Sequence, residues 1–246
     1  MPKIFPRFGY LRTLGEDHVI TILVNSEQFL KLLSSHSEQS QQYSLSKINQ
    51  HHLQRLIANI QTLVDALSTL KGNASRALLH QLGYEFLKNI VKDGYQLASI
   101  LIIPETTRLE LLHTHLGTDY LNHTIKDHDQ LRKVLAAVPA PERYAFLINT
   151  LGPASILSKV TSGTQLKSMC VLLPGERERS LLLSQLANHV TLRALTHYRD
   201  DKEIHQALSA SVAISSNPLQ KLNHRRQKSR CFTASCSTMI KRQRQR

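Results

Sequence analysis

The chain of 246 residues contains no tryptophan, and aromatic side chains make up only 5% of it. β-Sandwiches and β-barrels rely on aromatic and β-branched residues in their strands, so this shortage disfavours both classes. Leucine supplies most of the apolar content instead, and leucine is among the strongest helix formers. The sequence therefore predicts an all-α protein whose core is built mainly from leucine side chains.

Cysteine is also scarce, since the chain has only three, and all of them lie in its last third. Three cysteines do not form the disulfide framework typical of small secreted domains, which indicates folding in a reducing compartment. The first residues carry charges throughout and lack the long apolar core of a Sec-type signal peptide. No uncharged apolar run approaches the roughly 20 residues that a membrane-spanning helix needs.

Acidic residues are absent after Glu203, although the whole chain has a formal net charge of +13. Nine of the 31 lysines and arginines lie in 221–246, which leaves 22 basic side chains against 18 acidic ones in 1–220. The high basicity therefore belongs to a tail, and the folded body is not expected to be a basic groove for nucleic acid. Residues 217–246 are predicted to form a disordered basic tail.

A repeat of 34 or 35 residues runs through most of the chain. The last two units align without a gap, so that Gly, Gln-Leu, Pro and Leu recur at the same positions, and the unit before them fits after a single deletion. Two earlier units keep the apolar positions. The five predicted repeats span 15–48, 49–82, 83–116, 117–151 and 152–186. Self-similarity at this period is typical of helical solenoids, in which each unit buries its apolar face against its neighbours.

The predicted fold is thus an α-solenoid of about five 34–35-residue helical repeats. Residues 1–14 would lead into the repeats, and 187–216 would form a helical C-terminal cap before the basic tail. Leu135 occupies an apolar position that recurs in neighbouring units, so we expect it to lie in the core. Arg143 is interpreted as a surface or inter-repeat polar contact, because its counterparts are Arg108 and Glu178.

Each repeat is expected to hold three short helices, of which the first two could fuse. Asp93 and Asp127 are predicted to cap the second helix, since a short carboxylate accepts from free N–H groups at a helix start. Prolines are predicted to end the second helix, and glutamates to lie in the first turn of the third. These are Pro104, Pro139 and Pro174, and Glu105, Glu142 and Glu176. Gly117 and Gly152 are predicted to take the left-handed C′ conformation after the third helix.

No catalytic or cofactor motif stands out, so the chain is predicted to be non-enzymatic, with no cofactor and no small-molecule substrate. An active site without a sequence motif stays an alternative. Histidine and aspartate are dense around 113–129, which is compatible with a zinc site or with solvated histidines on helix surfaces, and the second interpretation is preferred. The histidines of this run are His113, His115, His123 and His128. Cys170 lies in a core position and is interpreted as a small buried hydrophobe.

The basic tail is the other feature that could carry function. Its clusters are compatible with nuclear import or with contacts to nucleic acid or anionic lipid, and alternatively with a solvated tail. The basic side chains are Arg225, Arg226, Lys228, Arg230, Lys241, Arg242, Arg244 and Arg246. Cys231 and Cys236 lie between the clusters and are candidates for lipidation, because acylation beside a polybasic segment provides the two signals of stable anchoring.

The units "QLRKVLAAVPAPERYAFLINTLG" and "QLASILIIPETTRLELLHTHLG" resemble Leu-Pro-Arg helical repeats in type IV (Dot/Icm-type) secretion effectors of intracellular bacteria. The resemblance covers 83–186 well and 15–82 loosely. It implies synthesis in a bacterial cytoplasm and injection into a host cell through a C-terminal signal. The protein would then act in the host cytoplasm, in the nucleus or at a membrane surface. The resemblance is to a scaffold, so it implies no catalytic residues.

Two functions follow from these observations. The first is a protein–protein interaction module that binds a host protein through side chains that vary between repeats. The tyrosines at varying positions are candidate contacts, with partial core packing as the alternative. They are Tyr84, Tyr95, Tyr120 and Tyr144. The second function is binding of nucleic acid or anionic membrane through the tail, with the helical body as a spacer.

Overall fold

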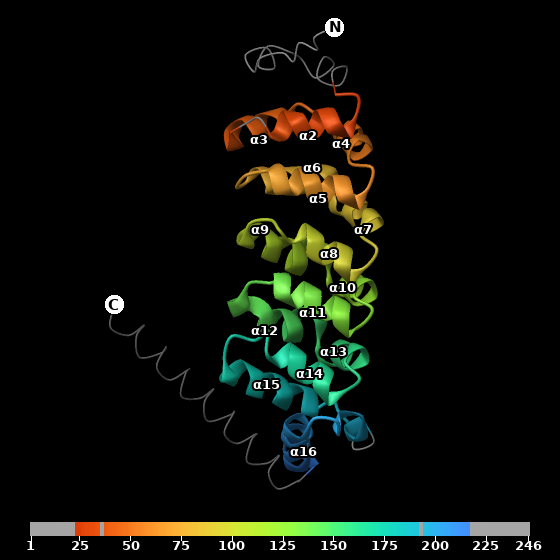
Figure 1. Ribbon diagram of the computed structural model, residues 1–246, viewed down its shortest axis with the longest axis vertical. Helices are drawn as coiled ribbons and strands as arrows, with labels where there is room; N and C mark the ends of the chain where they lie inside the picture. The colour runs from red at the N-terminus through yellow and green to blue at the C-terminus, as the bar shows by residue number, and fades with distance from the viewer. Residues whose placement is uncertain (1–22, 35–36, 192–193, 217–246) are drawn as a thin grey trace, which may run out of the picture. The chain divides into compact units, whose positions relative to one another are not determined.

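The computed structural model describes residues 23–34, 37–191 and 194–216, and within these ranges every regular element is a helix (Figure 1). The predicted all-α class is therefore confirmed. The predicted lead-in 1–14 and basic tail 217–246 lie outside the described residues, as does part of the first predicted repeat. Among the described residues, no helix combines the length and the apolarity that crossing a membrane requires.

The chain divides into two compact units, Met1–Lys159 and Val160–Arg246. The helices of the first unit are α2 (Ser26–Ser34), α3 (Glu38–Ser46), α4 (Gln50–Leu56), α5 (Ile60–Thr69), α6 (Ala74–Leu82), α7 (Tyr84–Ile90), α8 (Gly94–Ile100), α9 (Glu105–Glu110), η1 (Leu111–Leu116), α10 (Thr118–Thr124), α11 (His128–Ala137), η2 (Ala140–Glu142), α12 (Arg143–Ala145), η3 (Phe146–Leu151) and α13 (Pro153–Lys159). Those of the second unit are α14 (Gly163–Cys170), α15 (Glu176–Ala187), η4 (Ala194–Tyr198) and α16 (Lys202–Ser216).

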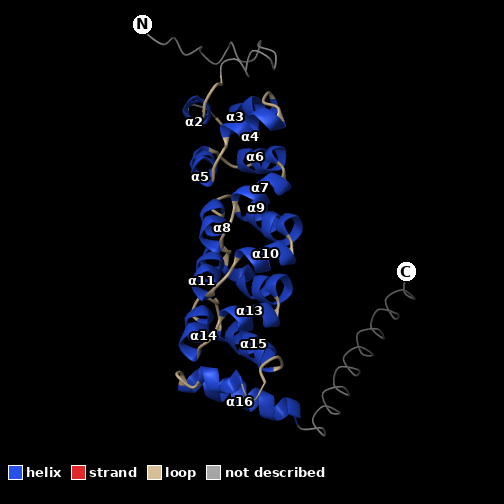
Figure 2. Ribbon diagram, turned by 90° about the vertical axis from the view of Figure 1, so that its right-hand side faces the viewer, coloured by secondary structure: helices blue, strands red, loops and turns tan. Residues whose placement is uncertain are grey.

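In the first unit, four helices pack one on the next in a row. Helix α2 packs on α5, α5 on α8, and α8 on α11, and Figure 2 shows these four following one another along one side. On the other side α3 packs on α6, and the short helices α7 and α10 pack on η1. Leucines fill the space between the helices, and Leu135 is fully buried as predicted. In the second unit, α16 packs on α14, α15 and η4.

Side-chain caps explain where the second helix of each predicted repeat begins. The carboxylate of Asp127 accepts from the N–H of Gln130 at 2.9 Å, and Asp93 caps α8 in the same way, so both predicted caps are confirmed. The Gln130 amide oxygen accepts from the N–H of Lys126, the residue before the cap, at 3.2 Å, which makes a variant of the reciprocal capping box. The recurring glutamine of the sequence is therefore a capping residue.

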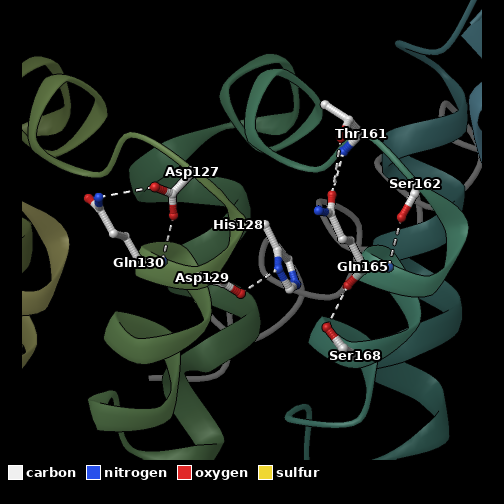
Figure 3. Close-up of polar contacts among 8 residues, drawn as sticks. All are labelled: Asp127, His128, Asp129, Gln130, Thr161, Ser162, Gln165 and Ser168. Atoms are coloured by element: carbon white, nitrogen blue, oxygen red, sulfur yellow. Dashed lines mark hydrogen bonds and ion pairs between the residues drawn. The ribbon is translucent and has the colours of Figure 1, made fainter.

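The same capping box opens α14 in the second unit. Ser162 accepts from the N–H of Gln165 at 3.2 Å, and the Gln165 amide oxygen accepts from the N–H of Thr161 at 2.8 Å (Figure 3). Serine thus replaces the aspartate of the earlier segments without loss of the motif, because either side chain supplies a short acceptor.

Glycines join the third helix of one segment directly to the first helix of the next. Gly117 has φ 79° and ψ 155°, and Gly152 has φ 82° and ψ 153°. The predicted positive φ is observed, but the predicted left-handed helical conformation is wrong, because its ψ is about 47°. The observed angles are the mirror image of extended backbone, a region that only glycine occupies readily. The chain therefore leaves η1 at Gly117 and enters α10 without an intervening loop.

Replacing Gly117 by alanine should destabilise the first unit through backbone strain alone. A Cβ atom built there meets no atom within 4 Å, so the cost of about 1–3 kcal/mol comes from φ and ψ and not from a clash. Gly117→Asn should be no better, because asparagine tolerates the left-handed helical region and not this one. Urea unfolding measures both variants, with Gly175→Ala as the control, since Gly175 has a negative φ and a Cβ there would displace only the carboxylate end of the Glu178 side chain. A wild-type midpoint for Gly117→Ala would contradict the assigned conformation.

Arginines fix the end of the second helix, where the sequence indicated only the prolines. Arg143 donates to the carbonyls of Val138 at 3.0 Å and Ala136 at 3.1 Å, both in the segment just before it. Arg108 donates likewise to the carbonyl of Ile103 at 2.8 Å. Arg143 thus holds the joint of its own segment, and its counterpart Arg108 also makes the expected inter-repeat contact, to the carbonyl of Ala137 at 2.5 Å.

The counterpart of Arg143 in the second unit is Arg179. Arg179 donates to the carbonyl of Leu173 at 3.3 Å, although the gapless alignment matched Arg143 with Glu178. Helix α15 starts at Glu176, two residues after Pro174. Its first turn therefore brings Arg179, and not Glu178, toward the carbonyl of Leu173. The recurring feature is an arginine that satisfies the orphan carbonyls of a helix end.

Candidate protein-binding site

The structure places the sequence-predicted site residues unevenly. The eight basic side chains of the tail and the two cysteines proposed for lipidation lie outside the described residues. Among the tyrosines, Tyr95 on α8 is 48% exposed, and Tyr144 is half-buried. The Tyr120 hydroxyl donates to the carbonyl of Val91 at 2.8 Å, which favours the packing alternative for that residue. Tyr84 belongs to a cluster of polar and aromatic side chains.

This cluster, which we call the α6–η1 cluster, is formed by Arg76, His80, Tyr84, Glu110 and His115. The Arg76 guanidinium lies 2.8 Å from the Glu110 carboxylate, and the imidazole of His115 lies 3.4 Å from the same oxygen. The rings of Tyr84 and His115 stack with centroids 3.7 Å apart, and His80 contacts Tyr84 edge-on at 6.3 Å. The cluster therefore joins α6, α7, α9 and η1.

The backbone explains why these side chains meet. Gly83 joins α6 to α7 at positive φ, so Tyr84 begins a new helix directly after the helix that carries Arg76 and His80. Glu110 ends α9, and η1 continues that helix with wider π-type turns to His115. Helix α7 packs on η1, which brings the Tyr84 ring onto the imidazole. Short π-helical segments are frequent at functional sites, because they displace side chains from regular helical positions.

The electrostatics of the cluster keep its carboxyl ionised and its phenol neutral. The hydrogen bond from Arg76 is the main cause that lowers the pKa of Glu110, so this carboxyl is ionised at neutral pH. Partial burial, and next the negative charge of Glu110, raises the pKa of the Tyr84 phenol, so the phenol is neutral and cannot act as a base. The cluster offers a charged guanidinium, 57% exposed, beside a stacked aromatic pair. Arginine and tyrosine are enriched at protein interfaces.

Two of the five cluster residues, Tyr84 and His115, are candidate or alternative site residues by sequence, whereas the ion pair of Arg76 with Glu110 was not predicted. Arg76 and Glu110 lie 34 residues apart, so they occupy the same position in consecutive predicted repeats. Opposite charges at one position of adjacent repeats are a signal for an inter-repeat ion pair, and this signal was present in the sequence. The stacking of Tyr84 on His115 has no such signal, because their positions are not equivalent.

The three other histidines of the run around 113–129 lie on separate helices. In the part of the chain that the structure describes, no three His, Cys, Asp or Glu side chains are placed to hold a metal ion. His113 and His123 are exposed, as expected for helix-surface histidines. His128 is buried and lies 3.2 Å from the Asp129 carboxylate, so the solvated interpretation is wrong for this residue. The imidazole of His113 lies 2.6 Å from the hydroxyl of Thr150.

Cys170 is a core residue, as predicted. Its side chain is buried, and this burial raises the pKa of the thiol to about 11. Since the thiolate is the nucleophilic form, Cys170 is a poor nucleophile at neutral pH.

In the second unit, Asp200 anchors η4 and α16 to the start of α14. Its carboxylate accepts from the N–H of Gly163 at 2.6 Å and from the N–H and hydroxyl of Thr164 at 2.9 and 2.7 Å. The Tyr198 hydroxyl donates to the carbonyl of Val160 at 3.0 Å, and Lys167 pairs with Asp201 at 3.2 Å. The N-terminus of α14 is therefore covered by an acidic segment of the same unit.

The stability of this anchor should depend on pH in the acid range. The hydrogen bonds from Thr164, led by its hydroxyl, lower the pKa of Asp200 to about 2. A carboxyl with a lowered folded-state pKa stabilises the fold above its unfolded pKa, and this contribution is lost as the pH falls from about 4 to about 2. We therefore expect Asp200→Asn to flatten that part of a stability profile measured by urea unfolding. An unchanged acid limb would show that Asp200 is not linked to folding.

No known protein family, curated protein or solved structure matches the chain.

Proposed function

We propose that the helices from α2 to α15 form an α-solenoid of 34–35-residue repeats. The support is the recurrence of the same local devices at intervals of 34 to 36 residues: the capping box, the arginine at the helix end, and the glycine at positive φ. Contacts at one repeat interval also join neighbouring segments, including the ion pair of Arg76 with Glu110. In such an architecture the leucines are buried between neighbouring repeats, and the side chains that face outward are free to vary.

We propose that this scaffold is a non-enzymatic protein–protein interaction module. The observation that carries the proposal is the α6–η1 cluster, in which two consecutive segments together present Arg76, Tyr84 and His115. The aromatic pair is already stacked, and the guanidinium is already held by its ion pair with Glu110. Groups restricted in this way lose little conformational entropy when they bind a protein surface. In line with the resemblance to Dot/Icm-type effectors, the partner would be a host protein.

Site-specific photo-crosslinking tests this binding function. A photoreactive phenylalanine analogue at position 84 should crosslink a discrete partner in host-cell lysate, whereas the same analogue at the exposed position 119 should not. The double substitution Arg76→Ala with Tyr84→Ala should abolish recovery of that partner by the tagged chain. Lys92→Ala with Lys126→Ala, at two exposed positions, is the matched control. Equal recovery with all variants would exclude the cluster as the binding surface.

Secretion is tested separately from binding. A translocation reporter fused to the full chain should enter host cells only from bacteria with a functional Dot/Icm-type machine. Deletion of 217–246 should abolish entry if the tail carries the signal. Entry from a machine-deficient strain at the same level would contradict the effector proposal.

Binding of nucleic acid or anionic membrane through the tail is the second proposed function. Its support is the charge distribution, since nine basic and no acidic residues lie in 221–246. Electrostatic binding of this kind weakens steeply with salt. Affinity for DNA, RNA and anionic vesicles should therefore fall along a salt series and disappear on deletion of 217–246. Full retention after deletion would exclude the tail.

A further inference from the structure

Lys159, the last residue of α13, lies in a polar group that the binding function does not use. Its ammonium nitrogen is 3.0 Å from the hydroxyl oxygen of Ser155, four residues earlier on the same helix. The Ser155 hydroxyl in turn donates its proton to the side-chain oxygen of Asn122 on α10. The side chains of all three residues are half-buried. A chain of hydrogen bonds thus runs from the lysine through the serine to the asparagine.

Lys159 also differs from the lysines that form ion pairs. Lys31 pairs with Glu27, Lys88 with Glu85, and Lys167 with two acidic side chains. Among the described residues, no carboxylate lies within ion-pair distance of Lys159. A neutral hydroxyl compensates the ammonium less than a carboxylate does, and burial lowers the pKa of Lys159. The uncharged, nucleophilic form of the amine is therefore more populated here than on an ordinary surface lysine.

The hydrogen-bond directions decide what this group can do. Ser155 has a single hydroxyl proton, which it donates to the side-chain oxygen of Asn122. Its oxygen therefore acts only as a hydrogen-bond acceptor toward Lys159. Lys159 is therefore not placed as a base that activates Ser155, because that role needs the serine proton directed at the amine. The neutral amine would instead give one N–H to Ser155 and keep its own lone pair available for attack.

We propose that Lys159 is an acyl-acceptor site, which reacts with an activated acyl group of the thioester or acyl-phosphate class. The amine nitrogen attacks the acyl carbonyl carbon and forms a C–N bond, and the C–S or C–O bond to the leaving group breaks. The nitrogen loses one proton to solvent, and the thiolate or phosphate departs with the bonding electron pair. The products are an amide on Lys159 and a free thiol or inorganic phosphate, and no oxidant or reductant is needed.

The test measures acetylation rates of individual lysines in the full chain. The chain is treated with acetyl phosphate in one arm and with the acetyl thioester of N-acetylcysteamine in the other, from pH 6.5 to about 10, a range that brackets the lower half of lysine titration. Peptide mass spectrometry then follows Lys159 and the exposed Lys126. We expect the Lys159 rate to exceed the Lys126 rate several-fold at pH 7.5 and to level off at lower pH. The arm in which this occurs identifies the acyl donor class.

Two substitutions at one position separate the effect from general accessibility. Ser155→Asp places a carboxylate beside the amine, which should lower the Lys159 rate at pH 7.5 about tenfold while Lys126 is unchanged. Ser155→Ala removes the acceptor of the ammonium and should leave the rate equal to or above that of the wild type. If either variant is misfolded by circular dichroism, the wild-type ratio of Lys159 to Lys126 decides. A Lys159 rate at or below that of Lys126 at every pH, in both arms, overturns the proposal.

Discussion

Leu135→Ala should destabilise the first unit by about 2–5 kcal/mol, the range measured for buried leucine truncations. Leu135 is fully buried on α11, and α11 packs on α8, so the truncation removes contacts between two segments of the chain. The loss has two parts, the transfer of the leucine side chain and the cavity that remains where the packed helices cannot close around it.

Urea unfolding followed by circular dichroism measures the effect, and Lys133→Ala is the matched control. Lys133 is exposed on the same helix, so its truncation should change the free energy of unfolding by less than about 0.5 kcal/mol. A shift in the midpoint without a change of slope would attribute the loss to stability alone. Equal midpoints for the wild type and Leu135→Ala would mean that α11 does not pack on α8 through this residue.

Gln41→Leu should also lower the free energy of unfolding strongly, even though it makes the core more apolar. Gln41 is fully buried on α3, and its amide nitrogen donates to the carbonyls of Leu33 at 2.8 Å and Thr69 at 3.2 Å. Its amide oxygen accepts from the N–H of Lys71 at 2.9 Å. One side chain thus satisfies backbone groups at the ends of both α2 and α5.

Leucine fits the volume but leaves these backbone groups without their partner. An unsatisfied buried polar group costs about 1–3 kcal/mol, so we expect a loss of about 3 kcal/mol or more. Gln41→Glu should also destabilise, because a carboxylate cannot donate to the two carbonyls. Gln39→Leu, at an exposed position on α3, is the control in the same urea experiment. A neutral Gln41→Leu would show that the bonds to Leu33 and Thr69 add nothing to stability.

The candidate site was only partly predictable. The residue type and variable position of Tyr84 indicate a contact residue, and His115 belongs to the histidine-rich run. The Arg76–Glu110 pair could have been found by comparing residues 34 positions apart. The stack of Tyr84 on His115 could not, because it depends on the wider π-type turns of η1 and on the glycine joint at Gly83. Neither the turns nor the joint changes the pattern of apolar residues from which helices are predicted.

The helical class, the leucine core and the helix ends at Asp93, Asp127, Gly117 and Gly152 were predictable from the sequence. These depend on local physics: Asp93 and Asp127 accept from N–H groups three residues ahead, and a proline disrupts the turn before it. The residues that each side chain contacts in other segments depend on how the helices pack. The Gln130 amide oxygen, for example, also accepts from the N–H of Gly94 at 2.9 Å, in the preceding segment.

At the glycine joints, too, one part of the conformation is predictable from sequence and another part depends on packing. Their positions and their positive φ follow from sequence, since only glycine has no Cβ penalty there. Their ψ near 150° depends on the direction in which the next helix must leave to pack against its neighbour. Arg179 replaced Glu178 as the counterpart of Arg143 because the start of α15, and not the alignment, sets which side chain faces the carbonyl. Local rules fix an element and its ends, whereas its partners are fixed only once the packed helices select one register.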